Sequence, residues 1–334
     1  MKDVSRQIKE AAKNIGFDLI GFSDVEINKK AYAHFQNWLK VGAEADMSYM
    51  SEKERARKRK SAKFLMENAK SVISLGINYY HEQKPLLKGH GRVARYAFGR
   101  DYHKILKGKL KKLEKFLELN FNAKTLSYVD TGPVLERSFA VQSELGFVGK
   151  NSCLITPEFG SWVLLGEIIA DLKVQPRVEQ NQKNTSMPSD LKTGCGTCTR
   201  CIDACPTHAI TCNGKGECFV DARKCLSYWT IEYKGPKSKI PQPIIEAIKN
   251  SKRLYGCDIC QEVCPHNCRA KNSNHKEFKT EKIAGDSQNI QKIMRLKSEK
   301  EFLKLFAGSP IMRAKLKGLK RTSRIIKSLH VSGN

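Results

Sequence analysis

The spacing of the cysteines between Cys195 and Cys268 constrains this 334-residue chain more than any other feature. A first motif reads C-x2-C-x2-C-x3-C-P and ends at Pro206. A second reads C-x2-C-x3-C-P and ends at Pro265, and Cys225 stands between the two. The first motif matches the bacterial run that binds a [4Fe–4S] cluster, whose fourth cysteine ligates the other cluster of a two-cluster protein. The segment therefore predicts two [4Fe–4S] clusters.

The crossover rule divides the motif cysteines into two sets of four. The first cluster is expected to bind to Cys195, Cys198, Cys201 and Cys264. The second cluster is expected to bind to Cys205, Cys225, Cys257 and Cys260. The rest of the 12 cysteines are expected to be ordinary thiols: Cys153, Cys212, Cys218 and Cys268.

Zinc, disulfides and scattered core thiols are the alternative interpretations of these cysteines. Zinc sites favour C-x2-C pairs far apart in sequence, and three ligands between Cys195 and Cys201 crowd a tetrahedral site. A disulfide framework belongs to secreted proteins, and the chain starts without the apolar segment of a signal peptide. Iron–sulfur ligation fits the spacing better than any of the three.

The charge of the chain favours a polyanionic partner. It carries 60 Lys and Arg residues against 34 Asp and Glu residues, a net charge of +26. Such an excess suits nucleic acid or an anionic membrane surface, although a merely solubilising surface has the same composition. No stretch approaches the ~20 consecutive apolar residues that span a bilayer. We therefore expect a cytoplasmic protein that binds nucleic acid and not a membrane.

The order of the predicted elements favours an α/β (α+β) domain followed by smaller units. Residues 1–172 are expected to form that domain, and the polar residues 173–193 a linker or surface loop. A ferredoxin-like domain with both clusters is expected at 194–270, followed by a short basic helical tail at 271–334. A bare two-cluster carrier needs far fewer residues, so the first domain is expected to house the redox chemistry.

Hydrophobic periodicity and turn residues locate the main elements. The pattern predicts a helix that ends at Gly16, and two strands at 151–155 and 161–169 that pair with each other. The other expected elements are strands at 17–22, 71–80 and 125–129 and helices at 31–41, 105–117, 301–306 and 310–329.

Six stretches, in order along nearly the whole chain, resemble the epoxyqueuosine reductases, which are cobalamin-dependent iron–sulfur enzymes of tRNA modification. They are RYAFGRDYH (95–103), VDTGPVLER (129–137), LGFVGKN (145–151), GSWVLLGE (160–167), DARKCLSYWTIE (221–232) and GCDICQEVCP (256–265). Two features depart from the family. His266 follows the last Cys-Pro, where the family usually has Trp, and the HEAT-like helical extension of longer members is short here.

The resemblance implies a fold and an activity. The first domain would be a cobalamin-binding catalytic domain, and cobalamin would receive electrons through the two [4Fe–4S] clusters from an external low-potential donor. The reaction would reduce epoxyqueuosine to queuosine at the wobble position of a tRNA anticodon, the final step of queuosine biosynthesis. Removal of the epoxide oxygen consumes two electrons and two protons and releases water, so a proton donor has to lie near that oxygen.

The resemblance also implies roles for individual residues. Asp130 matches the catalytic acid of the family, although Asp at the start of a helix commonly serves as an N-cap. Arg59, Tyr96, Asn151 and Ser161 are the expected cobalamin contacts; Tyr96 and Ser161 are also explained by core packing or a turn. Arg95, Asp101 and His103 are expected at the substrate entrance. The basic side chains expected to contact tRNA phosphates are Lys320, Arg321 and Arg324.

Three other functions are compatible with parts of the pattern. A corrinoid reductive dehalogenase shares the cofactors, but it usually carries a twin-arginine export signal and has no reason for this net charge. A non-catalytic RNA-binding zinc protein would contain zinc without sulfide. An electron carrier with a degenerate pocket would not bind cobalamin.

Overall fold

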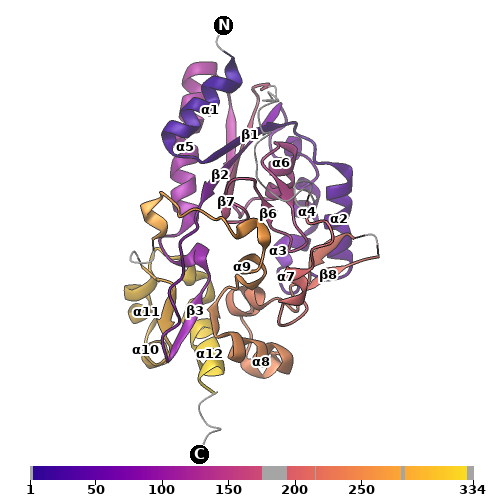
Figure 1. Cartoon of the computed structure of the whole chain (residues 1–334). Coiled ribbons are helices and arrows are strands. Elements are labelled where there is room, and N and C mark those ends of the chain that lie inside the picture. Colours follow the sequence, from indigo (N-terminus) through magenta and orange to yellow (C-terminus); the bar gives the residue numbers. More distant parts are fainter. Residues whose placement is uncertain (1–2, 175–193, 215, 280–282, 329–334) are drawn as a thin grey trace, which may run out of the picture.

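The computed structural model describes residues 3–174, 194–214, 216–279 and 283–328. The linker predicted at 173–193 therefore lies almost wholly outside the described residues, and it stays a prediction. The described chain contains a sheet with helices on both faces, a small cluster segment beside it, and a helical part below (Figure 1). These parts confirm the predicted α/β (α+β) class with a helical C-terminal region.

A four-stranded sheet forms the upper part of the molecule, with the strand order β1-β2-β7-β4. All three strand pairs are antiparallel. The strands are β1 (Leu19–Ser23), β2 (Ser71–Asn78), β4 (Thr125–Tyr128) and β7 (Val163–Ala170). Every residue of β2 is buried, because helices cover both faces of the sheet.

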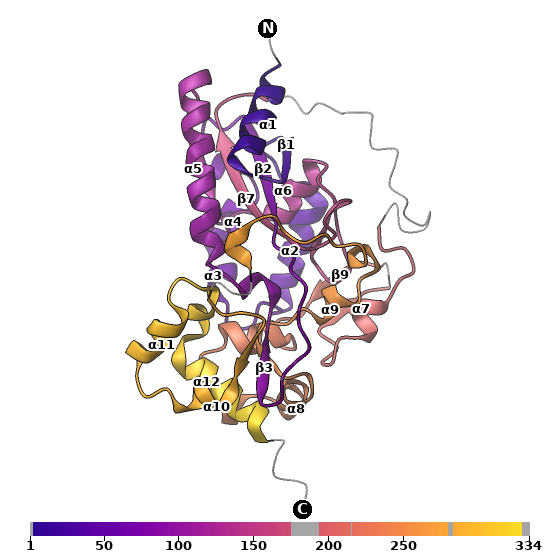
Figure 2. The same ribbon diagram turned by 60° about the vertical axis from the view of Figure 1, so that its left-hand side comes forward.

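Helices α1 (Val4–Ile15) and α5 (Tyr102–Phe121) cover one face of this sheet (Figure 2). Gly16 ends α1 with a φ of 95°, as the glycine in the sequence predicts. Helix α6 (Glu136–Gln142) packs on the other face, where Phe139 joins a core with strand residues. Near it lie α2 (Lys29–Lys40), α3 (Ser48–Ser51) and α4 (Lys53–Lys58).

A three-stranded sheet joins distant parts of the chain in the lower half. Strand β3 (His90–Val93) pairs in parallel with β10 (Arg253–Tyr255) and antiparallel with β11 (Ser287–Asn289). Each of the three comes from a different predicted segment of the chain. The segment boundaries stay predictions, but the sheet shows that the segments pack tightly against one another.

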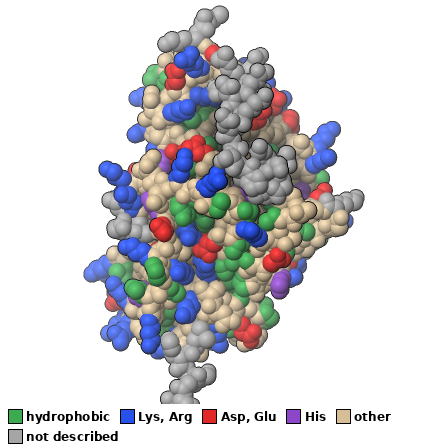
Figure 3. Space-filling model, viewed as in Figure 1, with side chains coloured by type: hydrophobic (Ala, Val, Ile, Leu, Met, Phe, Trp, Pro, Cys, Tyr) green, Lys and Arg blue, Asp and Glu red, His purple; other side chains and the backbone are tan. Residues whose placement is uncertain are grey.

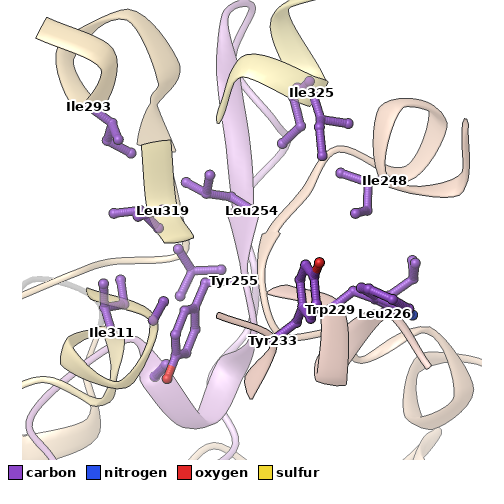
Figure 4. Close-up of a cluster of buried hydrophobic side chains, with 14 of the residues drawn as sticks. Leu226, Trp229, Tyr233, Ile248, Leu254, Tyr255, Ile293, Ile311, Leu319 and Ile325 are labelled. Carbon is purple, nitrogen blue, oxygen red and sulfur yellow. The ribbon is translucent and has the colours of Figure 1, made fainter. Parts of the chain in front are cut away.

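A large apolar core surrounds this second sheet (Figure 4). Leu254 of β10 is fully buried there, between Leu319 of the C-terminal helix and residues of the cluster segment such as Trp229. The helices of this part are α8 (Gln242–Ser251), α10 (Ile290–Arg295), α11 (Glu299–Phe306) and α12 (Lys315–Lys327). The single tail helix predicted at 310–329 is divided, because residues Pro310–Ala314 form a 3-10 helix before α12.

The cluster segment contains two short helices that pack on each other, α7 (Arg200–Asp203) and α9 (Ile259–Glu262). A hairpin of β8 (Ile210–Cys212) and β9 (Cys218–Val220) extends beside them. Cys212 and Cys218 face each other in this hairpin and form a disulfide. The prediction that these two are ordinary thiols is therefore wrong, because the hairpin register brings them together.

The predicted pairing of the strands at 151–155 and 161–169 is also wrong. Strand β6 (Leu154–Ile155) pairs with β5 (Phe147–Val148), whereas β7 pairs with β2 and β4. Only an isolated bridge between Thr156 and Gly160 joins the two predicted segments. β7 is the longer of the two strands, with eight residues against two, and it lies between β2 and β4 in the central sheet.

Candidate active site and cluster sites

The four cysteines predicted for the first cluster converge on one cavity. Cys195, Cys198, Cys201 and Cys264 all line it, together with Lys150, Asn151 and His266. The backbone N–H of Lys150 donates to Sγ of Cys195 over 3.4 Å, and its Nζ donates to the carbonyl of Cys198. His266 packs edge-to-face on Phe147, with ring centroids 5.2 Å apart, so it takes an aromatic role at the position where the resemblance expects Trp.

The cysteines predicted for the second cluster also lie near one another. Burial raises the pKa of Cys225, and the nearby thiol of Cys205 raises it further; Cys225 in turn acts in the same direction on Cys257 and Cys260. Burial raises the pKa of Cys257 to about 12. These thiols have to lose their protons when iron binds. In the described part of the chain, no group of three or more His, Cys, Asp or Glu side chains is arranged to hold a single metal ion.

Asp130 lies in the loop between β4 and α6. Its φ is 56°, and the Thr131 N–H donates to the Val129 carbonyl across it, which closes a tight three-residue turn. A γ-turn with a positive central φ is rare and strained. The side chain of Asp130 does not cap α6, because no side chain caps that helix. The capping role that competed with catalysis is thereby excluded.

The carboxylate of Asp130 accepts two hydrogen bonds from the start of α5. Tyr102 donates its hydroxyl to Oδ2 over 2.9 Å, and Nε2 of His103 lies 3.2 Å from the same oxygen. Nδ1 of His103 lies 2.8 Å from Oδ1 of Asp101. Two carboxylates therefore hold one imidazole between them, while 59% of the Asp130 side chain stays exposed to an incoming substrate.

The hydrogen bonds of His103 to Asp101 and Asp130 determine whether His103 or Asp130 carries the proton between them. Burial acts to lower the pKa of His103, but its hydrogen bonds to Asp101 and Asp130 outweigh this and raise the pKa to about 9. Burial acts to raise the pKa of Asp130, but the hydrogen bond and charge of His103 leave that pKa lowered. At neutral pH the pair is an imidazolium beside a carboxylate, so His103 carries the dissociable proton.

Arg59, predicted to contact cobalamin, is buried, and only part of the hydrogen-bonding capacity of its guanidinium is used by described residues. It is 3% exposed, its Nη2 donates to Sδ of Met50, and its guanidinium lies 5.5 Å from the Phe35 ring centroid. Its Nε and Nη1 have no hydrogen-bond partner among the described residues. A buried cation with free N–H donors fits the amide or phosphate oxygens of a corrinoid.

The other three predicted cobalamin contacts are already engaged within the protein. Oγ of Ser161 accepts from Gln261 and from Asn267, over 3.0 and 2.8 Å. The amide of Asn151 donates to the carbonyl of Cys260 and accepts from the Cys153 N–H. Tyr96 packs between aromatic rings, those of Tyr102 and Tyr255. Their predicted role as cofactor contacts stays a prediction.

Arg95 does not line an entrance, whereas the entrance role of Asp101 and His103 stays a prediction. It is buried, and its Nη1 bonds to Glu262 over 2.8 Å and to Asp258 over 3.4 Å. Its backbone N–H also donates to Asp258, which lies within the C-x2-C of the second motif. Arg95 therefore ties the first predicted domain to the cluster segment, and the prediction of an entrance role needs this correction.

The three basic residues predicted to contact tRNA lie differently on α12. Arg321 is buried, donates to the carbonyls of Gly235 and Trp229, and stacks 4.8 Å over the Tyr233 ring. It is a structural cation and cannot reach a phosphate. Arg324 is exposed and Lys320 half-buried. Lys and Arg side chains gather most densely over the helices of the tail in Figure 3.

Two residues beside Asp130, Arg313 and Arg55, were not predicted from the sequence. Arg313, in the 3-10 helix before α12, bonds Glu232 through Nε and Nη2 and lies 5.8 Å from the exposed Tyr49 ring. Its positive charge acts on Asp130. Arg55 donates to the Thr131 carbonyl over 2.8 Å. Their types gave no signal, because 60 basic residues are spread through the sequence.

Two family models match the two halves of this site. The one for "Epoxyqueuosine reductase QueG, DUF1730" covers residues 59–131, and the one for "4Fe-4S double cluster binding domain" covers residues 194–267. The chain is thus an iron–sulfur oxidoreductase that joins a double-cluster domain to a separate domain containing Asp130.

Similar proteins identify the family. The epoxyqueuosine reductase of Gloeobacter violaceus is 36% identical over 97% of this chain and 96% of its own length. A crystal structure of epoxyqueuosine reductase with a tRNA-Tyr epoxyqueuosine-modified stem loop matches at a TM-score of 0.79, with 29% identity over 97% of this chain and 80% of that one. The Bacillus subtilis enzyme, in a structure with its catalytic aspartate loop swung out of the active site, matches at 0.78, with 28% identity over 97% of this chain and 80% of that one. This chain belongs to the epoxyqueuosine reductase family.

Within the described ranges, no helix is both long and apolar enough to cross a bilayer.

Proposed function

We propose that this protein reduces epoxyqueuosine to queuosine at the wobble position of tRNA anticodons. The observation that carries the proposal is the exposed Asp130 carboxylate, held by Tyr102 and His103 in a chain of this family. A catalytic aspartate on a loop is named for the Bacillus subtilis relative, and Asp130 lies on such a loop. The epoxide oxygen leaves as water while the two carbons regain their double bond.

Asp130 passes two protons in turn to the leaving oxygen: the first comes from His103, and the second comes from solvent, which recharges His103. The first proton starts on His103, because the two flanking carboxylates stabilise its imidazolium form. It passes over the 3.2 Å from Nε2 to Oδ2 as the negative charge develops on the epoxide oxygen. Asp101 orients the imidazole and fixes which nitrogen faces Asp130.

Cobalamin and the two [4Fe–4S] clusters supply the electrons in this proposal. When bound, cobalamin provides a cobalt centre that reaches a strongly reducing state. Arg59 would hold it through its two nitrogens without a partner among the described residues, and Tyr96, Asn151 and Ser161 are the further proposed contacts. The predicted cluster ligands are Cys195, Cys198, Cys201 and Cys264 for one cluster and Cys205, Cys225, Cys257 and Cys260 for the other.

The tRNA partner and the place of action complete the proposal. A relative was solved with a modified tRNA stem loop, and the net charge of +26 favours such a polyanion. Lys320 and Arg324 remain the proposed phosphate contacts on α12. An external low-potential donor reduces the clusters, and the protein acts in the cytoplasm, where its tRNA substrate is located.

One experiment tests the proposed function. The anaerobically reconstituted protein is incubated with cobalamin, a low-potential reductant and tRNA that carries epoxyqueuosine. Mass spectrometry of the digested nucleosides is expected to show conversion to queuosine, with loss of one oxygen atom. Omitting cobalamin is the matched control. Unchanged epoxyqueuosine in a protein with both clusters and bound cobalamin would refute the proposal.

A further inference from the structure

The backbone conformation of Asp130 needs support from outside its own turn. A non-glycine residue in the left-handed region costs on the order of 1–3 kcal/mol and persists only where its surroundings impose it. The turn bond across Asp130 uses the N–H of Thr131 and the carbonyl of Val129. The N–H of Asp130 itself lies outside that bond. It donates instead to Oε1 of Glu136, over 2.5 Å.

A second acid lies behind Glu136. Glu167 is on β7, directly opposite Tyr128, the last residue of β4, and opposite Ser74 of β2. It is fully buried, neither of its carboxyl oxygens accepts from a donor group among the described residues, and the side chain within its reach is Glu136. The ionisable groups that act on it are Glu136 and, more weakly, Asp130.

Among the residues that the structure describes, no buried cation is paired with either acid. The positive group that acts on Glu136 is Arg137, whose guanidinium donates to the carbonyl of Ser152. Two carboxyl groups that face each other without a buried cation cannot both be ionised, so one has to keep its proton and donate it to the other. Glu167 is the more buried of the two and keeps the proton.

We propose that Glu136 and Glu167 are positioning residues, a proton-sharing pair that holds the backbone of Asp130 in its turn so that its carboxylate meets His103. Glu167 donates to Glu136, and Glu136 accepts from Glu167 and from the Asp130 N–H together. The pair anchors the catalytic loop to the central strand of the sheet. This inference rests on the proposed role of Asp130, but it makes a separate claim about what holds the loop.

The electrostatics of the pair agree with this arrangement. Burial and the charge of Asp130 raise the pKa of Glu136 to about 7, and burial and the charge of Glu136 raise the pKa of Glu167 well above its ordinary value. Glu167 therefore stays protonated at neutral pH, where Glu136 begins to ionise and becomes the stronger acceptor.

The test measures the loop and the turnover separately in the full-length reconstituted protein. Hydrogen–deuterium exchange of peptides that cover 129–133 reports the Asp130 N–H bond. Steady-state kinetics on epoxyqueuosine tRNA report kcat and KM. We expect Glu136→Ala to speed exchange in this segment and to lower kcat by about tenfold or more with little change in KM, because a misplaced acid loses most of its effect. Glu118→Ala, on the exposed face of α5, is the matched control.

Conservative variants separate positioning from folding. Glu167→Gln keeps a donor toward Glu136. Amide hydrogens in residues 129–133 are therefore expected to exchange more slowly in this variant than in Glu167→Leu, and its kcat is expected to be higher. Equal damage from both would overturn the proposal, as would an exchange rate unchanged by Glu136→Ala. Asp130→Asn keeps the backbone N–H of residue 130, so amide hydrogens in the loop should exchange at the wild-type rate while kcat falls. An active Asp130→Asn enzyme would instead refute the proposed role of Asp130 and leave the exchange result interpretable.

Discussion

Nε2 of His103 lies 3.2 Å from Oδ2 of Asp130, and Nδ1 of the same ring lies 2.8 Å from Asp101. In the proposed mechanism, this geometry separates the residue that stores the proton, His103, from the residue that delivers it, Asp130. Asp130 projects into solvent, whereas His103 is more enclosed and more basic. The proposed acid, Asp130, therefore has a close contact with His103, a residue that the resemblance placed only at the substrate entrance.

The pH dependence of the reaction follows from His103. Its pKa is raised from 6.5 to about 9, so the protonated form, and the stabilisation it gives to the fold, is fully present below pH 6.5 and is lost as the pH rises through 9. We expect kcat/KM on epoxyqueuosine tRNA to fall along a basic limb near pH 9. Asp101→Asn should move that limb to lower pH, because one of the two stabilising charges is gone. A limb that does not move would exclude Asp101 from this role.

The cluster assignment predicts separable losses of iron. Cys201→Ala should remove the first cluster and Cys205→Ala the second, so each purified variant should retain about four of the eight irons. Ligation is coupled to folding, so each variant is compared with wild type by circular dichroism. Cys268→Ala, an exposed thiol outside both sets, is the control. Fewer than about six irons in reconstituted wild type would show that the two-cluster count is wrong.

Substitutions of neighbouring basic residues on α12 are expected to change different properties, tRNA binding in one case and the stability of the fold in the other. Changing Lys320 and Arg324 to Ala should weaken tRNA binding and flatten the slope of log affinity against log salt, because fewer counterions are released. Arg321→Ala should instead lower the free energy of unfolding by about 2 kcal/mol, since two buried carbonyls lose their donor. Filter binding at several salt concentrations and chemical denaturation measure the two effects. An unchanged slope for the double variant would mean that α12 presents only a solvated face to the RNA.

Because Arg95 pairs with Asp258, its substitution is expected to affect iron binding at the second cluster as well as the stability of the fold. Arg95→Ala leaves the buried Asp258 without its guanidinium partner, and breaking such a pair costs about 3–5 kcal/mol. The melting temperature should fall, and iron should be lost, because Asp258 lies between two cluster cysteines. Arg92→Ala, at a half-buried arginine whose side chain donates to the Lys84 carbonyl, should have a smaller effect. Equal melting temperatures for the two variants would contradict this.

Local patterns in the sequence were sufficient for much of the fold. The apolar spacing along α5 and the glycine after α1 predicted those helices, because helix formation there depends on neighbours within the same stretch. The cysteine spacing predicted the four side chains that meet at the first cavity, since the motif wraps one cluster. The pairing of β7 with β2 depends on partners about 90 residues away, so it was not predictable from the turn at 157–160.

The site was less predictable because its residues are combined by the fold. Glu136 and Glu167 both occur in segments that resemble the family, but only the packing of α6 on the sheet brings the two side chains near each other. The sequence predicted that Arg321 contacts tRNA phosphates at the surface. Its position three residues after Gly318 instead puts it on the buried face of α12. Composition reports how many charges a chain has and cannot report which side of a helix they occupy.

The most direct test of the central claim is the turnover of Asp130→Asn. The variant keeps the size of the side chain and its backbone N–H bond to Glu136, and it loses only the acid. With iron content, cobalamin binding and tRNA affinity confirmed as equal to wild type, conversion of epoxyqueuosine to queuosine is followed by nucleoside mass spectrometry under single-turnover conditions. The account predicts a rate lower by on the order of a hundred-fold or more, the usual scale for general acid catalysis. A rate near that of wild type would contradict it.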